Sequence, residues 1–215
     1  MKRISAITLI FAMLLSACDI IDEPYMNKPI NGGQTGETVQ KVLLEEFTGH
    51  KCPNCPEGAA TAEQLKQAYG NKFIIIAYHA GFFARTYNDF PEDYRTVVGN
   101  ELNSNFNVQN YPAGVINRTE FNSSLVMGNT SWPSATAEII DNEPRLHLTI
   151  EHTFTSGNLS VTVNAKALSD IEPLKTCVFI TEDGLISPQL TPSGTEENYE
   201  HNHVFRMSLN GTWEI

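Results

Sequence analysis

The segment Val42–Gly58 reads VLLEEFTGHKCPNCPEG and decides the fold of this chain. Its first half is an apolar run of strand-like composition. Its second half carries two cysteines, Cys52 and Cys55, separated by two residues at the point where a helical pattern begins. A redox-active dithiol is usually presented at such a strand-to-helix turn. We therefore expect a buried strand, a turn with both cysteines and a helix in direct succession.

The residues that follow extend this segment into a β-α-β unit. Residues 56–69 are rich in Ala, Glu, Gln, Leu and Lys, with apolar residues near helical spacing, and Gly70 is placed to end the helix. Residues 72–79 (KFIIIAYH) form an almost continuous apolar run, which is typical of a central strand in a parallel sheet. The cysteines are thus predicted to lie at the first strand-to-helix turn of this unit.

The electrostatic surroundings of this turn favour a thiolate. A cysteine at the start of a helix lies near unpaired backbone N–H groups and the positive end of the macrodipole, and His50 and Lys51 can add positive charge. We expect Cys52 to be the more exposed sulfur and to attack, and Cys55, one helical turn further on, to resolve the mixed disulfide.

The N-terminus has the features of a targeting segment. Two basic residues precede the apolar run 4–15, which is too short to span a bilayer comfortably, and LSAC follows at Leu15–Cys18. This pattern resembles a bacterial lipoprotein signal, so we predict a signal peptide over 1–17, lipid attachment at Cys18 and a flexible tether over 18–40. The alternative is an ordinary secretory signal in which Cys18 is incidental.

Charge excludes several classes of function. The chain carries 14 Lys and Arg against 25 Asp and Glu, a formal net charge of −11. This balance argues against a nucleic-acid partner and against a polybasic contact with a membrane surface. Neither a phosphate-binding glycine loop nor a Ser-His-Asp arrangement stands out in the sequence. Nucleotide chemistry and hydrolysis are therefore not expected.

The cysteine pair favours a disulfide over a metal. Outside the cytoplasm, Cys52 and Cys55 can form a disulfide that is either structural or exchangeable. A zinc site generally needs four ligands, and the chain has no second Cys-x-x-Cys. His201 and His203 can share one face of a strand, but no third ligand is evident. We expect no metal and no cofactor beyond the disulfide. Cys177 is expected to be an inert buried thiol, with a resolving or intermolecular role as the alternative.

The pattern changes in the C-terminal part of the chain. After Pro144, apolar and polar residues alternate, and residues 156–158 (SGN) read as a hairpin turn. We predict an α/β domain over 41–143 and a β-sandwich-like (Ig-like) antiparallel domain over 144–215. The strands are few for a self-sufficient sandwich, so this second domain is expected to be incomplete or to be completed by another surface.

These features resemble the thioredoxin fold. The acidic-apolar strand before Cys-x-x-Cys, the β-α-β unit and Pro112 just before the next strand carry the likeness. The resemblance implies that the Tyr111–Pro112 bond is cis and lies beside the dithiol, that the backbone of Tyr111 pairs with an extended peptide, and that Glu46 is a buried proton acceptor.

The chain departs from thioredoxins at the dithiol itself. Lys51 replaces their Trp, and Pro53 and Asn54 replace Gly-Pro between the cysteines. These two intervening residues tune thiolate stability and are expected to meet the substrate. The four aromatic side chains between residues 82 and 90 are a second candidate for a substrate groove, although such clusters are more often core.

A closer resemblance extends over nearly the whole chain. The LSAC motif, EEFTG at 45–49, CPNC at 52–55, YPAGVINR at 111–118 and HNHVFR at 201–206 are similar to the outer-membrane-protein-28-related lipoproteins of Bacteroidetes. That family joins a thioredoxin-like domain to a β-sandwich, usually continues beyond the point where this chain stops, and has been suggested to include surface adhesins or receptors.

The sequence thus leads to one functional hypothesis and one rival. The first is an outer-membrane-anchored envelope lipoprotein that exchanges disulfides with envelope proteins or peptides, with Cys52, Cys55, Glu46 and Pro112 at its active site. The rival is a non-catalytic adhesin or assembly protein that uses the thioredoxin fold as a scaffold.

Overall fold

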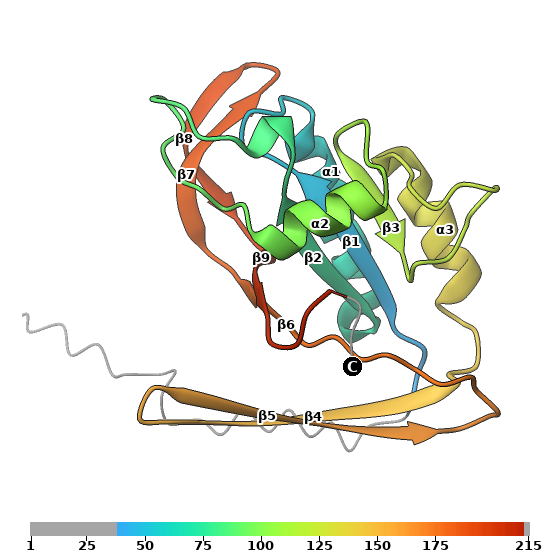
Figure 1. Cartoon of the computed structure of the whole chain (residues 1–215). Coiled ribbons are helices and arrows are strands. Elements are labelled where there is room, and N and C mark those ends of the chain that lie inside the picture. The colour runs from blue at the N-terminus through green and yellow to red at the C-terminus, as the bar shows by residue number, and fades with distance from the viewer. Residues whose placement is uncertain (1–37, 213–215) are drawn as a thin grey trace, which may run out of the picture. The chain divides into compact units, whose positions relative to one another are not determined.

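A parallel β-α-β unit forms the centre of the fold, as the sequence predicts (Figure 1). The structure is a computed structural model and describes residues 38–212. Strand β1 (Val42–Thr48) pairs in parallel with β2 (Phe73–His79) along its whole length. Helix α1 (Cys55–Tyr69) connects the two strands, with a proline in its first turn and a glycine of positive φ, Gly70, directly after its end.

Three further strands complete the central sheet in the order β3-β1-β2-β9-β6. β3 is antiparallel to β1, β9 is parallel to β2, and β6 is antiparallel to β9. These strands are β3 (Ala113–Ile116), β6 (Phe179–Glu182) and β9 (Val204–Ser208). The molecule is therefore a mixed α/β protein with one central sheet.

Helices cover both faces of this sheet. On one face, α1 and α3 (Trp132–Ile139) share an apolar cluster with Leu44 of β1, in which Trp132 is fully buried. On the other face, α2 (Val97–Asn105) packs through Leu102 against the aromatic rings of β1 and β2. Three short 3-10 segments, η1 (Gly70–Lys72), η2 (Phe82–Ala84) and η3 (Asn129–Ser131), join these elements. Successive side chains of β1 thus point to different helices.

A buried ion pair fixes the α2 side of β1. Glu45 is 0% exposed, and its two carboxylate oxygens accept hydrogen bonds from the Arg118 guanidinium at 2.7 and 2.8 Å. The Tyr78 hydroxyl donates to the same carboxylate at 3.0 Å. Burial and this neighbouring carboxylate raise the pKa of Tyr78. Arg118 therefore compensates a charge that lies inside the protein.

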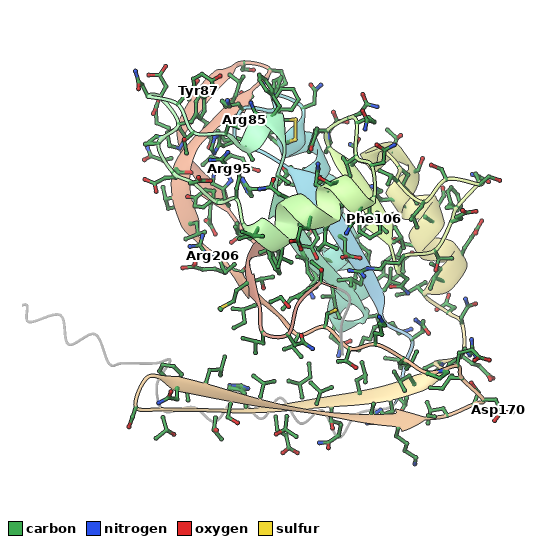
Figure 2. All side chains as sticks on the ribbon, in the orientation of Figure 1. Arg85, Tyr87, Arg95, Phe106, Asp170 and Arg206 are labelled. Carbon is green, nitrogen blue, oxygen red and sulfur yellow. A yellow bond between two sulfur atoms is a disulfide. The ribbon has the colours of Figure 1, made fainter. Side chains whose placement is uncertain are left out.

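Loss of Arg118 is expected to be costly. Arg118→Met keeps an apolar stem but leaves the Glu45 carboxylate buried without its counter-charge, so the free energy of unfolding should fall by about 3 to 5 kcal/mol. The control is Arg206→Met, because Arg206 pairs with Glu182 at the surface (Arg206 is labelled in Figure 2), and such a pair contributes about 0 to 1 kcal/mol. Urea unfolding measures both. Equal, small losses would contradict a stabilising role for the buried pair.

The C-terminal part of the chain differs from the predicted β-sandwich-like domain. Both β6 and β9 belong to the central sheet, so that sheet crosses the predicted boundary between residues 143 and 144. The physical reason is that β2 offers a free edge: the Ala77 N–H donates to the His203 carbonyl at 2.8 Å, and Val204 is fully buried. Strand-like runs in the sequence at 177–181 and 204–209 predict these two strands but not their partners.

The remaining strands form two separate antiparallel pairs. One is β4 (Leu146–Thr155) with β5 (Asn158–Ala167), whose turn at Ser156 and Gly157 has positive φ angles and confirms the predicted hairpin. Residues 149–163 of this pair belong to a different compact unit from the rest of the described chain. The other pair is β7 (Leu185–Thr191) with β8 (Gly194–His201).

The N-terminal targeting predictions lie outside the described residues. They comprise the signal peptide over 1–17, lipid attachment at Cys18 and all but the last three residues of the predicted tether. No helix in the described range 38–212 is long and apolar enough to cross a membrane.

Candidate functional site

The two predicted site cysteines are joined. Cys52 and Cys55 form a disulfide at the N-terminus of α1, visible as a yellow bond beside the turn after β1 (Figure 2). Within the turn, the Cys52 N–H donates to the Gly49 carbonyl at 2.9 Å. The Cys55 N–H donates to the Cys52 carbonyl at 3.2 Å. The pair therefore lies at the positive end of the helix dipole, which stabilises a thiolate once the disulfide opens.

The predicted difference in exposure between the two sulfurs is wrong. Cys52 is 1% exposed and Cys55 is 2% exposed. The Gln189 side-chain amide donates to the Cys52 carbonyl at 3.0 Å, and the Leu190 N–H donates to the His50 carbonyl at 2.7 Å. Strand β7 therefore lies over the cysteine turn, and exposure does not decide which sulfur is attacked.

Glu46 and Pro112 come together beside α1. Gly58 lies at their meeting point, because a Cβ atom there would come within 2.7 Å of the Pro112 ring and 3.1 Å of Glu46 Oε1. The Tyr111–Pro112 bond is cis. The Tyr111 hydroxyl donates to Asn103 Oδ1 at 2.5 Å. The absence of a side chain at residue 58 is what permits this close approach.

The Glu46 carboxyl is set up to hold a proton. Glu46 is 2% exposed, and its Oε1 has no hydrogen-bond partner among the described residues. Burial, with a smaller contribution from the Glu63 carboxylate, raises the pKa of Glu46 to about 8. The group is thus mainly protonated at neutral pH and titrates close to it, which suits proton transfer to or from a buried thiol.

A cavity of about 330 Å³ lies next to the disulfide, between α1 and β8. Its walls include Cys55 and Glu46 together with His79 and His201. Burial lowers the pKa of His201 to about 4 and that of His79 well below its usual value, so both imidazoles are neutral. Cys55, the Glu46 carboxyl group and the two uncharged imidazoles therefore line the same cavity.

Of the two positive charges predicted beside the cysteines, at His50 and Lys51, the structure supports only that of Lys51. His50 is 1% exposed, its Nε2 lies 3.0 Å from the Arg85 carbonyl, and burial lowers its pKa, so it adds no positive charge to the turn at neutral pH. The Lys51 ammonium lies 3.5 Å from the centre of the Tyr87 ring. Lys51 therefore remains the one cation of this pair near the dithiol.

The other predicted site residues lie around this turn. Pro53 is half-buried and Asn54 is exposed, so the residues between the cysteines form the accessible part of the motif. Within the predicted aromatic cluster, Phe82 and Tyr87 are each 57% exposed, whereas Phe90 stacks on the His50 ring. Phe82 and Tyr87 therefore form an exposed surface beside Lys51, whereas Phe90 packs against His50.

The remaining cysteine lies away from this cavity, whereas both C-terminal histidines line it. Cys177 carries a free, half-buried thiol that donates to the Thr212 carbonyl at 3.2 Å. His203 pairs with Glu63 at 2.8 Å and with Asp183 at 3.3 Å and also lines the cavity, in whose wall His201 is buried. Among residues 38–212, no three His, Cys, Asp or Glu side chains are arranged to hold a metal ion.

Sequence reasoning missed Gln189, His79 and the cavity role of His201. Gln189 is 137 residues from Cys52 along the chain, and nothing in its neighbours marks it. His79 ends the predicted apolar strand, so its position at the carboxyl end of a parallel strand was a usable signal.

A family model matches more than half of the chain, and a solved structure has a similar fold. The family model described as outer membrane protein Omp28 matches residues 99–214. Among solved structures, HBP35 of Porphyromonas gingivalis superposes with a TM-score of 0.58 at 19% identity, over 82% of this chain and 59% of that protein. A protein of Agrobacterium tumefaciens gives a TM-score of 0.49 at 11% identity, over 83% and 76%. The chain thus spans 59% of the length of HBP35. A comparison with curated proteins gives no match.

Proposed function

From the premise that this chain belongs to the outer membrane protein Omp28 family, we propose that it is an envelope lipoprotein anchored through Cys18 that exchanges disulfides with other envelope proteins. The fold we assign to its central part is thioredoxin-like. The β-α-β unit with a dithiol at the start of α1 and a cis-proline before β3 supports this assignment.

One observation carries the proposal. The Cys52–Cys55 disulfide lies at a helix N-terminus, and the cavity wall next to it contains a carboxyl group whose pKa is raised to about 8. A static structural disulfide takes up and releases no protons, so it does not require a titratable acid beside it. A disulfide that is opened and closed needs a group that takes and returns the thiol proton.

The exchange balances without a further cofactor. A substrate thiolate attacks one sulfur of the Cys52–Cys55 bond, that bond breaks, and a mixed disulfide forms while the other cysteine leaves as a thiolate. A second substrate thiolate then attacks the mixed disulfide, which releases the oxidised substrate and the reduced protein. Two electrons pass from the substrate to the protein, and the same steps in reverse oxidise the protein. Glu46 takes up or supplies the proton of Cys55.

The reduction potential of the Cys52–Cys55 pair tests this function. We expect a value between about −270 and −120 mV, the range of exchangeable dithiols. The measurement equilibrates the protein with glutathione or dithiothreitol buffers and quantifies alkylated Cys52 and Cys55 by mass spectrometry, which separates them from Cys177. A potential below about −300 mV would identify a structural disulfide and overturn the proposal.

A binding role is the second candidate, and a separate observation favours it. The β4–β5 pair exposes four large apolar side chains, each more than 40% accessible: Leu148, Ile150, Phe154 and Leu159. An isolated two-stranded ribbon with such a face is usually covered by another surface. In this reading the protein is an adhesin or assembly partner, and the disulfide only fixes the turn.

A further inference from the structure

The pair β7–β8 is an arm that leaves the central sheet and returns to it. The chain leaves β6 at Glu182 and re-enters the sheet at Val204 of β9, so the arm (residues 185–201) is joined to the sheet by two short links (Figure 1). Each link contains one residue with a positive φ angle, 73° at Gly184 and 57° at His203. Both ends of the arm therefore contain a residue in a backbone conformation that most residues rarely adopt.

The two links are tied to one another. The Gly184 N–H donates to Asn202 Oδ1 at 2.7 Å, and the His203 N–H donates to Asp183 Oδ1 at 2.6 Å. These hydrogen bonds close the base of the arm independently of its contacts with the cysteine turn. The arm therefore has a defined base about which it can move as one body.

The tip half of the arm is attached to the cysteine turn through β7. The Leu190 N–H donates to the His50 carbonyl, and the Gln189 side-chain amide donates to the Cys52 carbonyl. An extended polypeptide approaching the disulfide from this side would use the same two carbonyl groups. Strand β7 thus occupies the place of such a polypeptide.

The inner face of the arm is mainly polar, and its apolar contribution to the attachment is limited to ring contacts such as those of His201 with His79 and Tyr94. The buried side chains of β7 are Ser187 at 4% and Gln189 at 2% exposure, and β8 contributes His201 at 5%. Ser187 Oγ and His201 Nε2 are buried without a hydrogen-bond partner among the described residues. Unsatisfied polar groups oppose closure, whereas the sheet beneath is held by apolar packing.

We propose that the β7–β8 arm is a displaceable cover of the Cys52–Cys55 disulfide, and that a protein substrate gains access by replacing β7 along His50–Cys52. The arm then sets the specificity of the exchange: substrates with an extended segment that pairs with these carbonyls open the arm, and other protein thiols are kept out. This consequence for specificity rests on the proposed function, whereas the movement of the arm does not.

Gln189→Ala in the full chain tests the proposal, with Glu197→Ala as the control because Glu197 is exposed on the same arm. The disulfide is reduced either by reduced thioredoxin, a protein dithiol, or by dithiothreitol, and the ratio of the two rates is taken. Loss of a buried hydrogen bond should raise this ratio about tenfold in Gln189→Ala. It should leave the ratio unchanged in Glu197→Ala.

Hydrogen–deuterium exchange of the wild-type chain provides a readout that needs no variant. The Leu190 amide should exchange at least about a hundredfold faster than the amides of β1, because the arm opens without unfolding of the sheet. If the Leu190 amide exchanges at the same rate as the amides of β1, or if the ratio of reduction rates is unchanged in Gln189→Ala, the proposal that the arm is a displaceable cover is overturned. A potential below about −300 mV with Leu190 still exchanging early would instead overturn the proposed function and support the movable arm.

Discussion

Replacement of Cys55 by serine is expected to trap the substrates of this protein on Cys52. In the Cys55→Ser variant, the Cys52 thiolate attacks a substrate disulfide, one substrate sulfur becomes bonded to Cys52, and the other leaves as a thiolate. No second cysteine in the turn remains to release the product, so the mixed disulfide persists. In the wild type the same intermediate is resolved and should be close to undetectable. The trapped species are separated on non-reducing gels and identified by mass spectrometry.

Three matched variants make this result specific. Cys52→Ser should trap far less, because a substrate that replaces β7 along His50–Cys52 meets Cys52 first: the β7 side chain Gln189 is bound to the Cys52 carbonyl. The double variant should trap nothing. Cys177→Ser should not change trapping, since the Cys177 thiol lies outside the cysteine turn and donates a hydrogen bond to the Thr212 carbonyl. Undiminished binding of envelope proteins by the double variant, with no mixed disulfide in any variant, would favour the binding role instead.

Glu46→Gln is expected to remove a large pH dependence of stability. The pKa of Glu46 is about 8 in the native state against 4.5 for the unperturbed group. Below pH 4.5 both states are protonated. As the pH rises from 4.5 to 8, the unfolded state loses its proton first, so it binds fewer protons and the free energy of unfolding falls. Above pH 8 the loss is complete, and its size is as much as about 5 kcal/mol.

The measurement compares urea unfolding of the wild type and Glu46→Gln between pH 4 and pH 9. From pH 4 to pH 9, the free energy of unfolding of the wild type should fall relative to that of Glu46→Gln by several kcal/mol, at most about 5 kcal/mol. Glu138→Gln, at an exposed position on α3, should follow the wild type. A wild-type stability that parallels the variant at every pH would show that Glu46 is ionised in the native state.

Glu46 shows how far sequence reasoning reaches at this site. The resemblance to thioredoxins implied that Glu46 is a buried proton acceptor; the structure shows that it is buried, in the wall of the same cavity as Cys55, and the proton-acceptor role stays a prediction. By contrast, His50 was expected to contribute positive charge, and burial prevents this. The identity of a residue and its place on an element follow from local pattern, whereas its protonation follows from everything packed around it.

The sequence by itself determined the local chemistry of this protein. Apolar periodicity, the proline and glycine at the two ends of α1 and the spacing of Cys52 and Cys55 are short-range features, and they led to the β-α-β unit with its disulfide at the helix start.

The tertiary structure alone decided what surrounds that disulfide. The contacts that cover it, from Gln189 and Leu190, reach across about 140 residues, and β9 enters the sheet through pairing with β2 from an equally distant part of the chain. Strands pair through backbone N–H and C=O groups, which all residues except proline have. The partners of β7 and β9 therefore could not be predicted from the side chains of these strands.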